Sequence, residues 1–261
     1  MTRAKISPIA LYDSGRGVES VLRQCRRILP NERWLVLKDV NNQPYGCKSS
    51  QEIIEAGFSC FAQLMQGNIK AAVVACHTSS AIALPYLRKH FSVPIIGMLH
   101  PTAQLLAKQY AETDIFWLAT PASVRANRFV SLARSYGYAG RIHAIACPDW
   151  VVAIESGCAV SLRRIIAIFI QKYGDQLRTG QYKILYGCTH YPLIEKWLKS
   201  EFTCPDLYID PAEAVALALQ KMLTQKNLLT SLITQNRGAV VSYIEPSSLF
   251  LRGVCTALVT T

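Results

Sequence analysis

The sequence predicts an α/β fold, and three observations lead to this prediction. Short apolar segments rich in β-branched residues recur along the chain, and segments with helical periodicity separate them. The strand segments are apolar throughout, which is typical of parallel sheets covered on both faces. Alternation of strand and helix then gives a layered α/β architecture. With 261 residues the chain approaches the size limit of a single core, so two domains are favoured.

Nine segments carry the strand pattern. They are Ile9–Tyr12, Trp34–Leu37, Ala71–Ala75, Val93–Met98, Ile115–Ala119, Ile142–Ala146, Ile184–Gly187, Leu207–Ile209 and Val240–Tyr243. The helical segments between them space apolar residues three and four positions apart, so that one face can pack on a sheet. The expected helices include Gly17–Leu29, Ser49–Gln66, Ser80–His90 and Val124–Tyr136.

Composition and charge restrict the class of protein. Hydrophobic residues make up 51% and charged residues 17%, as in folded globular chains. The formal net charge is +11, but Lys and Arg are scattered and never exceed two in a row, so nucleic-acid binding is not favoured. No apolar stretch is long enough to cross a membrane, and the first apolar run is too short for a signal peptide. The cytoplasm is therefore the expected compartment, without membrane association.

The nine cysteines are expected to be reduced thiols, since no secretory signal accompanies them. Most are expected to be small structural residues, namely Cys25, Cys60, Cys158, Cys204 and Cys255. Two others, Cys76 and Cys188, directly follow strands. In α/β sheets, sites form at the carboxyl ends of strands, so these two thiols are candidates for chemistry.

Three strand ends carry chemically capable side chains. They lead into Asp13-Ser14-Gly15, Cys76-His77-Thr78 and Cys188-Thr189-His190. Helix capping is the alternative for the polar residues, since Asp, Ser and Thr accept hydrogen bonds from free N–H groups at helix starts. Asp13 would then cap the helix after it, and Thr78 or Ser79 the helix expected near Ser80.

A partial internal repeat favours the chemical interpretation. After Cys76, the residues Leu87, Phe91 and Pro94 follow at 11, 15 and 18 positions; after Cys188, the same residue types follow at 10, 14 and 17. One strand–Cys–helix–strand unit therefore occurs twice, with chance similarity of two βαβ units as the alternative. Two such units facing each other would place two thiols on opposite sides of a cleft.

Two opposed thiols suit proton exchange at a carbon centre. Inversion of a stereocentre by proton transfer requires a base on one face and an acid on the other. Cysteine can serve as either, because its ordinary pKa of about 8.5 is close to operating pH and neighbouring groups can shift it. Asp13 and His190 are candidates for accepting or relaying the thiol protons.

These residues belong to a set of motifs that resembles glutamate racemase over nearly the whole chain. The motifs are Tyr12-Asp13-Ser14-Gly15, Pro44-Tyr45-Gly46, Ala75-Cys76-His77-Thr78, Thr120-Pro121-Ala122-Ser123-Val124, Cys147-Pro148 with Glu155, and Gly187-Cys188-Thr189-His190-Tyr191-Pro192. They stand in the family's order. The last of them is the most specific.

The resemblance implies two similar α/β domains with parallel-type sheets flanked by helices, and an active site in the cleft between them. The first domain would comprise residues 1–97 plus 210–261, and the second residues 98–209. The implied reaction is racemisation of L- and D-glutamate without pyridoxal phosphate, metal or other cofactor, and it supplies D-glutamate for peptidoglycan. The implied ligand is the small-molecule substrate glutamate, and a homodimer is compatible with the sequence.

The resemblance also implies the residues of the site. The implied catalytic residues are Cys76, Cys188, Asp13, His190 and Glu155. The implied substrate-binding residues are Ser14, Pro44, Tyr45, Gly46, His77, Thr78, Thr120, Ser123 and Thr189.

The chain also departs from the family pattern. Where the family has Asn after its first catalytic cysteine, this chain has His77, so substrate alignment is where a difference is expected. A protonated His77 would also favour the Cys76 thiolate, whereas a neutral ring would act mainly by its bulk on the substrate pocket. Gly17-Val18-Glu19 replaces the usual Gly-Gly-Leu, and Ser123 replaces a threonine while keeping its hydroxyl.

Four alternatives remain open at this point. Cys76, His77, Cys188 and His190 could bind zinc, or one thiol could act with His190 in a hydrolase. The substrate could be aspartate or another amino acid. The chain could also be a racemase-like protein that binds or regulates without catalysis.

Overall fold

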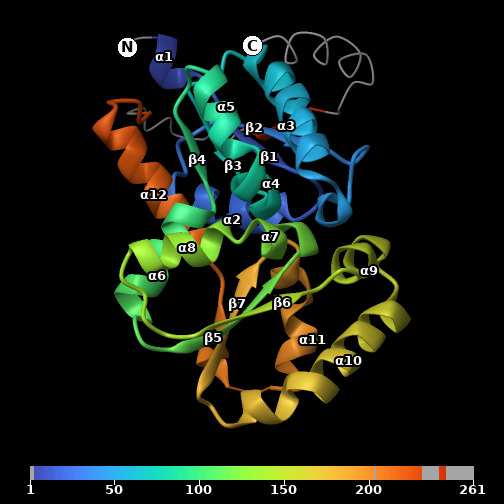
Figure 1. Ribbon diagram of the computed structural model, residues 1–261. Coiled ribbons are helices and arrows are strands. Elements are labelled where there is room, and N and C mark those ends of the chain that lie inside the picture. Colours follow the sequence, from blue (N-terminus) through green and yellow to red (C-terminus); the bar gives the residue numbers. More distant parts are fainter. Residues whose placement is uncertain (1–2, 203, 231–240, 245–261) are drawn as a thin grey trace.

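The computed structural model describes residues 3–202, 204–230 and 241–244, and it contains two parallel sheets flanked by helices (Figure 1). The first sheet has the strand order β4-β3-β1-β2-β9 and the second β6-β5-β7-β8. The strands are β1 (Ile9–Asp13), β2 (Trp34–Lys38), β3 (Ala71–Val74), β4 (Ile95–Gly97), β5 (Asp114–Ala119), β6 (Ile142–Ala146), β7 (Tyr182–Gly187), β8 (Tyr208–Ile209) and β9 (Val241–Ile244). The α/β prediction is confirmed, and each expected strand overlaps an observed one. Val240, the first residue of the last expected strand, lies outside the described residues, as does Cys255.

The central strands explain the uninterrupted apolar runs. Every residue of β1 and of β3 is buried, because helices cover both faces of the first sheet. Parallel pairing sets Ile9 beside Trp34 on one side and beside Ala71 on the other. Strands that alternate apolar and polar residues would be typical of a sheet with one face in water. The uninterrupted apolar runs therefore correctly predicted a sheet covered on both faces.

The principal helices lie between the strands. They are α2 (Val18–Ile28), α3 (Ser50–Met65), α4 (His77–Ile82), α5 (Leu84–His90), α6 (Leu99–Gln109), α7 (Pro121–Ala126), α8 (Arg128–Ser135), α9 (Trp150–Ser156), α10 (Ala159–Arg178), α11 (Glu195–Lys199) and α12 (Ala212–Gln225). Short helical segments are α1 (Arg3–Ile6), η1 (Tyr45–Cys47), η2 (Tyr191–Ile194) and η3 (Pro205–Leu207). None of the helices within the described residues combines the length and apolarity that a membrane span requires.

Two expected helices are each divided in two. The helix expected over Ser80–His90 begins earlier, at His77, and breaks at Ala83 because Pro85 has no N–H to continue the hydrogen-bond ladder. The helix expected over Val124–Tyr136 breaks at Asn127, whose φ of 48° lies in the left-handed region. Asn tolerates this conformation better than most residues, so it can turn the chain between α7 and α8.

The chain returns to the first sheet near its C-terminal end. Strand β9 pairs with β2 in parallel, and α12 packs against α2 on one face of that sheet. Buried side chains of α12, such as Val215 and Leu219, join the same apolar cluster as Val18 and Val21 of α2. On this basis we propose the division into residues 1–97 plus 210–261 and residues 98–209.

Candidate active site

The carboxyl ends of strands from both sheets meet, and they bring several of the predicted residues together. Asp13 ends β1, and the Thr189 hydroxyl after β7 donates to its Oδ2 at 2.9 Å. Thr78, in the helix after β3, lies 2.8 Å from the hydroxyl oxygen of Thr120, which follows β5. Each of these bonds joins a residue of the first sheet's end to one of the second sheet's end. The candidate site is therefore built by both sheets.

Cys76 is the N-cap residue of α4 and is buried. Its sulfur lies 3.6 Å from the Ser14 hydroxyl oxygen, and Ser14 in turn donates to Asp13 at 3.4 Å. Burial raises the pKa of the Cys76 thiol, and the charge of Asp13 adds to this. The Ser14 hydroxyl acts in the opposite direction, because a hydrogen bond from it favours the thiolate. The resting thiol is therefore protonated and has a donor ready for its ionised form.

Cys188 stands at the start of a second hydrogen-bonded series. Its sulfur lies 3.7 Å from Nδ1 of His190, whose Nε2 lies 2.6 Å from Oε1 of Glu155. The same Glu155 oxygen accepts the Arg16 backbone N–H at 2.9 Å. Burial raises the pKa of Cys188 well above its ordinary value, with a smaller contribution from the charge of Cys76. Burial also acts to raise the pKa of Glu155, but its bonds to His190 and Arg16 outweigh it and lower that pKa.

Asp13 is fully buried and does not cap α2. The helix begins at Val18 with Gly17 as its N-cap residue, and no side chain caps it. Asp13 instead accepts from the Gly15 N–H at 3.1 Å and from Thr189. Burial raises the pKa of Asp13 despite the opposing effect of His190 and of these donors. The capping alternative is wrong for Asp13, and it is wrong for Thr78 and Ser79, which lie inside α4.

A cluster of three hydroxyls closes one side of the site. Thr78 lies 3.2 Å from Ser123, and Thr120 donates to Ser123 at 3.0 Å, all of them buried. Gly46 packs directly on this cluster, since a Cβ added there would lie 3.0 Å from the Cβ of Thr120. Glycine at this position therefore lets the segment Pro44–Gly46 approach the second sheet's end.

Tyr45 lies in the same segment, but its side chain points toward β1 and the end of β2 in the first sheet. Its hydroxyl donates to Asp39 and lies 2.8 Å from the hydroxyl of Tyr12. A contact from Pro44–Gly46 to a ligand would therefore come from the backbone of this segment. Asp39 was not among the residues expected from the sequence, because no motif marks it.

His77 is 3% exposed, and within the described residues neither ring nitrogen has a hydrogen-bond partner. Burial lowers the pKa of His77 to about 3, so the ring is neutral near neutral pH. Of the two states expected for His77, the neutral ring is therefore the one that the structure favours, and a protonated ring that would promote the Cys76 thiolate is not. Two unpartnered polar atoms next to Cys76 are costly, and a ligand with a donor or an acceptor group could satisfy them.

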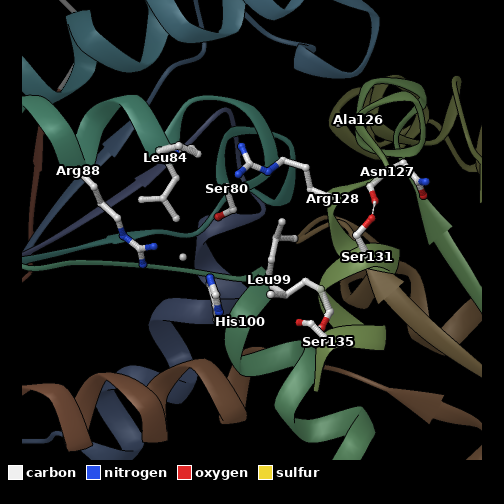
Figure 2. A pocket seen from close by; sticks show the side chains of 13 residues that line it. Ser80, Leu84, Arg88, Leu99, His100, Ala126, Asn127, Arg128, Ser131 and Ser135 are labelled. Carbon is white, nitrogen blue, oxygen red and sulfur yellow. Dashed lines mark hydrogen bonds between the residues drawn. The ribbon is translucent and has the colours of Figure 1, made fainter. Parts of the chain in front are cut away.

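A cavity of about 690 Å³ lies away from the two thiols, between α5, α6 and α8. Figure 2 shows Arg88, His100 and Arg128 around it. None of the residues expected from the sequence lines this cavity. The sequence did not predict this cavity, because the basic residues around it are far apart in the chain: Arg88 and Arg128 are separated by 40 positions.

The residues of the zinc alternative are not gathered as a ligand set. Among the residues that the structure describes, no three side chains of His, Cys, Asp or Glu come together in an arrangement that could hold a metal ion. His190 instead bridges Cys188 and Glu155.

Comparisons with known proteins show the family to which the chain belongs. A family model described as Asp/Glu/Hydantoin racemase matches residues 16–219. A glutamate racemase of Clostridium botulinum is 32% identical over 228 residues, which cover 87% of this chain and 88% of that protein. The crystal structure of glutamate racemase isoform RacE1 from Bacillus anthracis has a TM-score of 0.82 at 28% identity, covering 95% of this chain and 91% of that chain. A Francisella tularensis glutamate racemase solved in complex with D-glutamate shares the fold, with a TM-score of 0.79 at 23% identity over 95% of this chain and 91% of that chain.

Proposed function

The chain belongs to the Asp/Glu/hydantoin racemase family and is an amino-acid racemase, and we propose that it interconverts L- and D-glutamate with Cys76 and Cys188 as the two acid/base residues. The names of the relatives support glutamate as substrate. The observation that carries the mechanism is that two buried thiols follow strands of different sheets, each with its own set of proton-accepting neighbours.

In each direction one cysteine acts as thiolate and the other as thiol. The thiolate removes the α-proton, so that the Cα–H bond breaks, an S–H bond forms and the electron pair stays on the carbanion. The opposite thiol then gives its proton to the other face of Cα and becomes a thiolate. Because burial raises the pKa of both Cys76 and Cys188, each thiolate is a stronger base than an exposed one.

His190 prepares Cys188 for this exchange. The Glu155 carboxylate accepts the Nε2–H of the ring, which leaves Nδ1 as the acceptor that faces the Cys188 sulfur. The ring can then take the thiol proton, and Glu155 stabilises the imidazolium that forms. Glu155 therefore sets the tautomer of His190 through this hydrogen bond.

Asp13 serves Cys76 through Ser14. The Ser14 hydroxyl lies between the Cys76 sulfur and Asp13, so a proton can pass from the thiol to the carboxylate by way of that hydroxyl. Asp13 can hold this proton because burial raises its pKa. The two cysteines thus use different partners, which lets one be ionised while the other is protonated.

The remaining polar groups hold the substrate. The hydroxyls of Thr78, Thr120 and Ser123 form one cluster, and Thr189 and Ser14 lie beside Asp13. Hydroxyls and the free N–H groups at helix starts can donate hydrogen bonds to the carboxylate of the substrate. They can also stabilise the negative charge that this carboxylate gains when the carbanion forms. No step needs a cofactor. The product D-glutamate would supply peptidoglycan synthesis.

The proposal is tested by incubation with L- or D-glutamate in deuterated water, with chirality and Cα exchange measured together. We expect both enantiomers to racemise with deuterium uptake, and Cys76→Ala and Cys188→Ala each to abolish racemisation. Cys25→Ala, in α2, is the matched control and should keep turnover. If the protein racemises aspartate and not glutamate, the proposed substrate is wrong while the proposed type of reaction stands. Binding of glutamate without exchange would refute catalysis.

A further inference from the structure

The start of α2, on the first sheet's side, makes polar contacts with the second sheet's end. The Arg16 backbone N–H donates to Oε1 of Glu155 at 2.9 Å. The Ser20 hydroxyl donates to the carbonyl oxygen of Thr189 at 3.2 Å and shares its proton with that of Gly17 at 2.9 Å. Ser20 is 3% exposed, so water does not compete for this proton. One short segment therefore holds two separate segments of the second sheet's side.

Gly17 allows this close approach. A Cβ at that position would lie 2.2 Å from the Thr189 hydroxyl oxygen and 2.8 Å from Nδ1 of His190. Any side chain there would push these groups away, whereas glycine leaves them room. Nδ1 is also the ring atom that lies 3.7 Å from the Cys188 sulfur. The start of α2 therefore reaches the ring that serves Cys188.

The Thr189 carbonyl belongs to the peptide unit that joins Thr189 to His190. Because a peptide unit is planar, a hydrogen bond to its oxygen fixes the orientation of the whole unit. That orientation sets where the side chains on either side of the unit point. The His190 ring points toward Cys188 and Glu155, and the Thr189 hydroxyl points toward Asp13. The donor to this carbonyl therefore controls how the ring is aimed.

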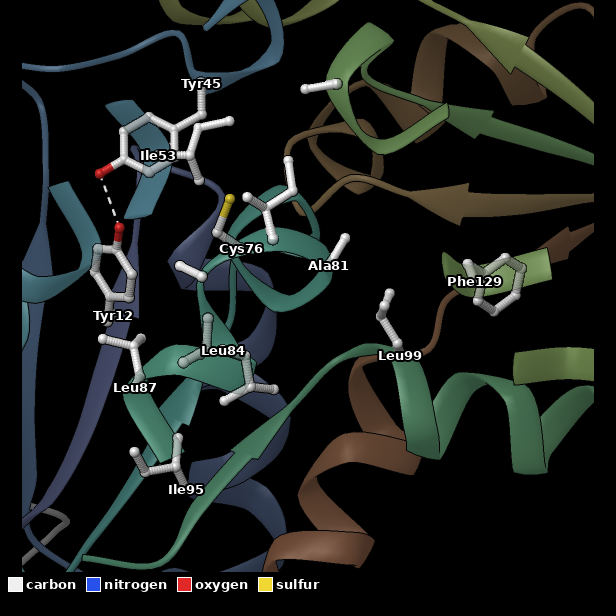
Figure 3. Close-up of a cluster of buried hydrophobic side chains, with 14 of the residues drawn as sticks. Tyr12, Tyr45, Ile53, Cys76, Ala81, Leu84, Leu87, Ile95, Leu99 and Phe129 are labelled. Carbon is white, nitrogen blue, oxygen red and sulfur yellow. Dashed lines mark hydrogen bonds between the residues drawn. The ribbon is translucent and has the colours of Figure 1, made fainter. Parts of the chain in front are cut away.

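The Cys76 side is built differently. Its partners Ser14 and Asp13 follow β1 of the same sheet as Cys76 itself. Figure 3 shows Cys76 close to Tyr45, within a buried cluster to which both belong. The hydrogen-bonded series of Cys188, in contrast, stands on the second sheet's side and receives donors from the first. Loss of those donors should therefore affect the ring beside Cys188 first.

We propose that Ser20 is a positioning residue that acts on catalysis through His190. By holding the Thr189 carbonyl, Ser20 keeps Nδ1 of the ring facing the Cys188 sulfur. It neither touches the substrate nor exchanges a proton with it. The series that serves Cys188 is complete only while α2 lies against the second sheet's end. The inference rests on the proposed role of Cys188 as acid/base.

The first test is the exchange with solvent of the His190 Nε2 proton, followed by NMR in the full chain without substrate. This proton lies in the bond to Glu155, and its signal is identified by its absence from His190→Asn. Ser20→Ala removes the bond to the Thr189 carbonyl and frees the ring, so the proton should exchange faster. Ser20→Thr keeps a hydroxyl and should restore slow exchange.

Thr102→Val is the matched control. The Thr102 hydroxyl is buried and donates to the Met98 carbonyl at the start of α6 at 2.7 Å, as Ser20 donates to Gly17 at the start of α2. Both variants therefore lose a hydroxyl from a helix start, but Ser20→Ala also loses a bond to the second sheet's side. Exchange at His190 should be unchanged in Thr102→Val. Circular dichroism verifies that each variant is folded.

Kinetics test whether the change at the ring reaches catalysis. Ser20→Ala should lower kcat for racemisation by roughly two- to tenfold, the range expected for loss of one neutral hydrogen bond. KM should change less, because Ser20 bonds to backbone groups and not to the substrate. In the His190→Asn background, Ser20→Ala should lower kcat no further, since two residues that act through the same group are not additive.

Three results would overturn the inference: unchanged exchange of the His190 proton in Ser20→Ala, wild-type kcat in that variant, or an equal loss of kcat with and without the His190 ring. Failure of the proposed function looks different. If Cys188→Ala keeps racemase activity, the proposed function is wrong, while proton exchange still decides whether Ser20 holds His190.

Discussion

Glu155→Gln tests how much the charge of Glu155 contributes to catalysis. Oε1 of Glu155 accepts both from Nε2 of His190 at 2.6 Å and from the Arg16 N–H at 2.9 Å. A glutamine with its amide oxygen in the same place keeps both hydrogen bonds and loses only the charge. The substitution therefore separates charge from geometry at this position.

The expected loss follows from the two kinds of hydrogen bond. A bond to a charged group contributes about 1.5–3 kcal/mol and a neutral one about 0.5–1.5, so the imidazolium of His190 loses about 1–1.5 kcal/mol of stabilisation. Since 1.36 kcal/mol corresponds to tenfold in rate, kcat should fall by about tenfold. Glu155→Ala should lose more, because it leaves two donors without a partner.

The assay is the initial rate of racemisation from each pure enantiomer, with and without α-deuterium. Enantiomers have equal free energies, so kcat/KM must fall equally in the two directions. A role on the Cys188 side should appear as unequal changes in kcat and in the deuterium isotope effects. Glu213→Gln is the matched control, since its ion pair with Arg27 is exposed and should not affect turnover. Unchanged kcat in Glu155→Gln would refute the role of Glu155 in activating His190.

The bond between Glu155 and His190 also predicts how the stability of the fold depends on pH. The pKa of Glu155 is lower in the folded chain than the ordinary value of 4.5. The stabilisation that it provides is therefore complete above about 4.5 and is lost as the pH falls through the lowered folded-state pKa. The melting temperature of wild type should consequently fall more than that of Glu155→Gln when the pH is lowered through this range. Equal falls would show that Glu155 is not stabilised in its ionised form.

Three further predictions follow from other parts of the structure. His77→Asn should retain or raise glutamate racemisation and leave the pH–rate profile near neutrality unchanged, since burial holds the pKa of His77 at about 3; a lost titration near pH 7 would contradict this. Gly17→Ala should lower kcat, because its Cβ would lie 2.2 Å from the Thr189 hydroxyl oxygen and displace it; wild-type kinetics would show that the loop adapts. Lys70→Met should destabilise the fold by about 3–5 kcal/mol in denaturant titrations, because it leaves Glu32 buried without its cation; a change below about 1 kcal/mol would mean that other donors satisfy this carboxylate.

The sequence by itself predicted the α/β class and the nine strands that the described residues contain, because fully buried parallel strands need uninterrupted apolar runs such as those of β1 and β3. It also predicted candidate site residues after three strands, and the structure brings Asp13 beside Thr189 and Thr78 beside Thr120. Reactive side chains directly after strands gather at one edge of a sheet, and the motif around Cys188 is specific.

The tertiary structure decided what depends on contacts between distant segments. The strand order, the return of β9 to β2, and the partners of Asp13 and Glu155 are set by packing and have no local signal. The same holds for the burial that keeps His77 neutral. Periodicity reports only which face of a segment is buried, whereas pKa and hydrogen-bond direction depend on the groups that surround a buried atom in three dimensions.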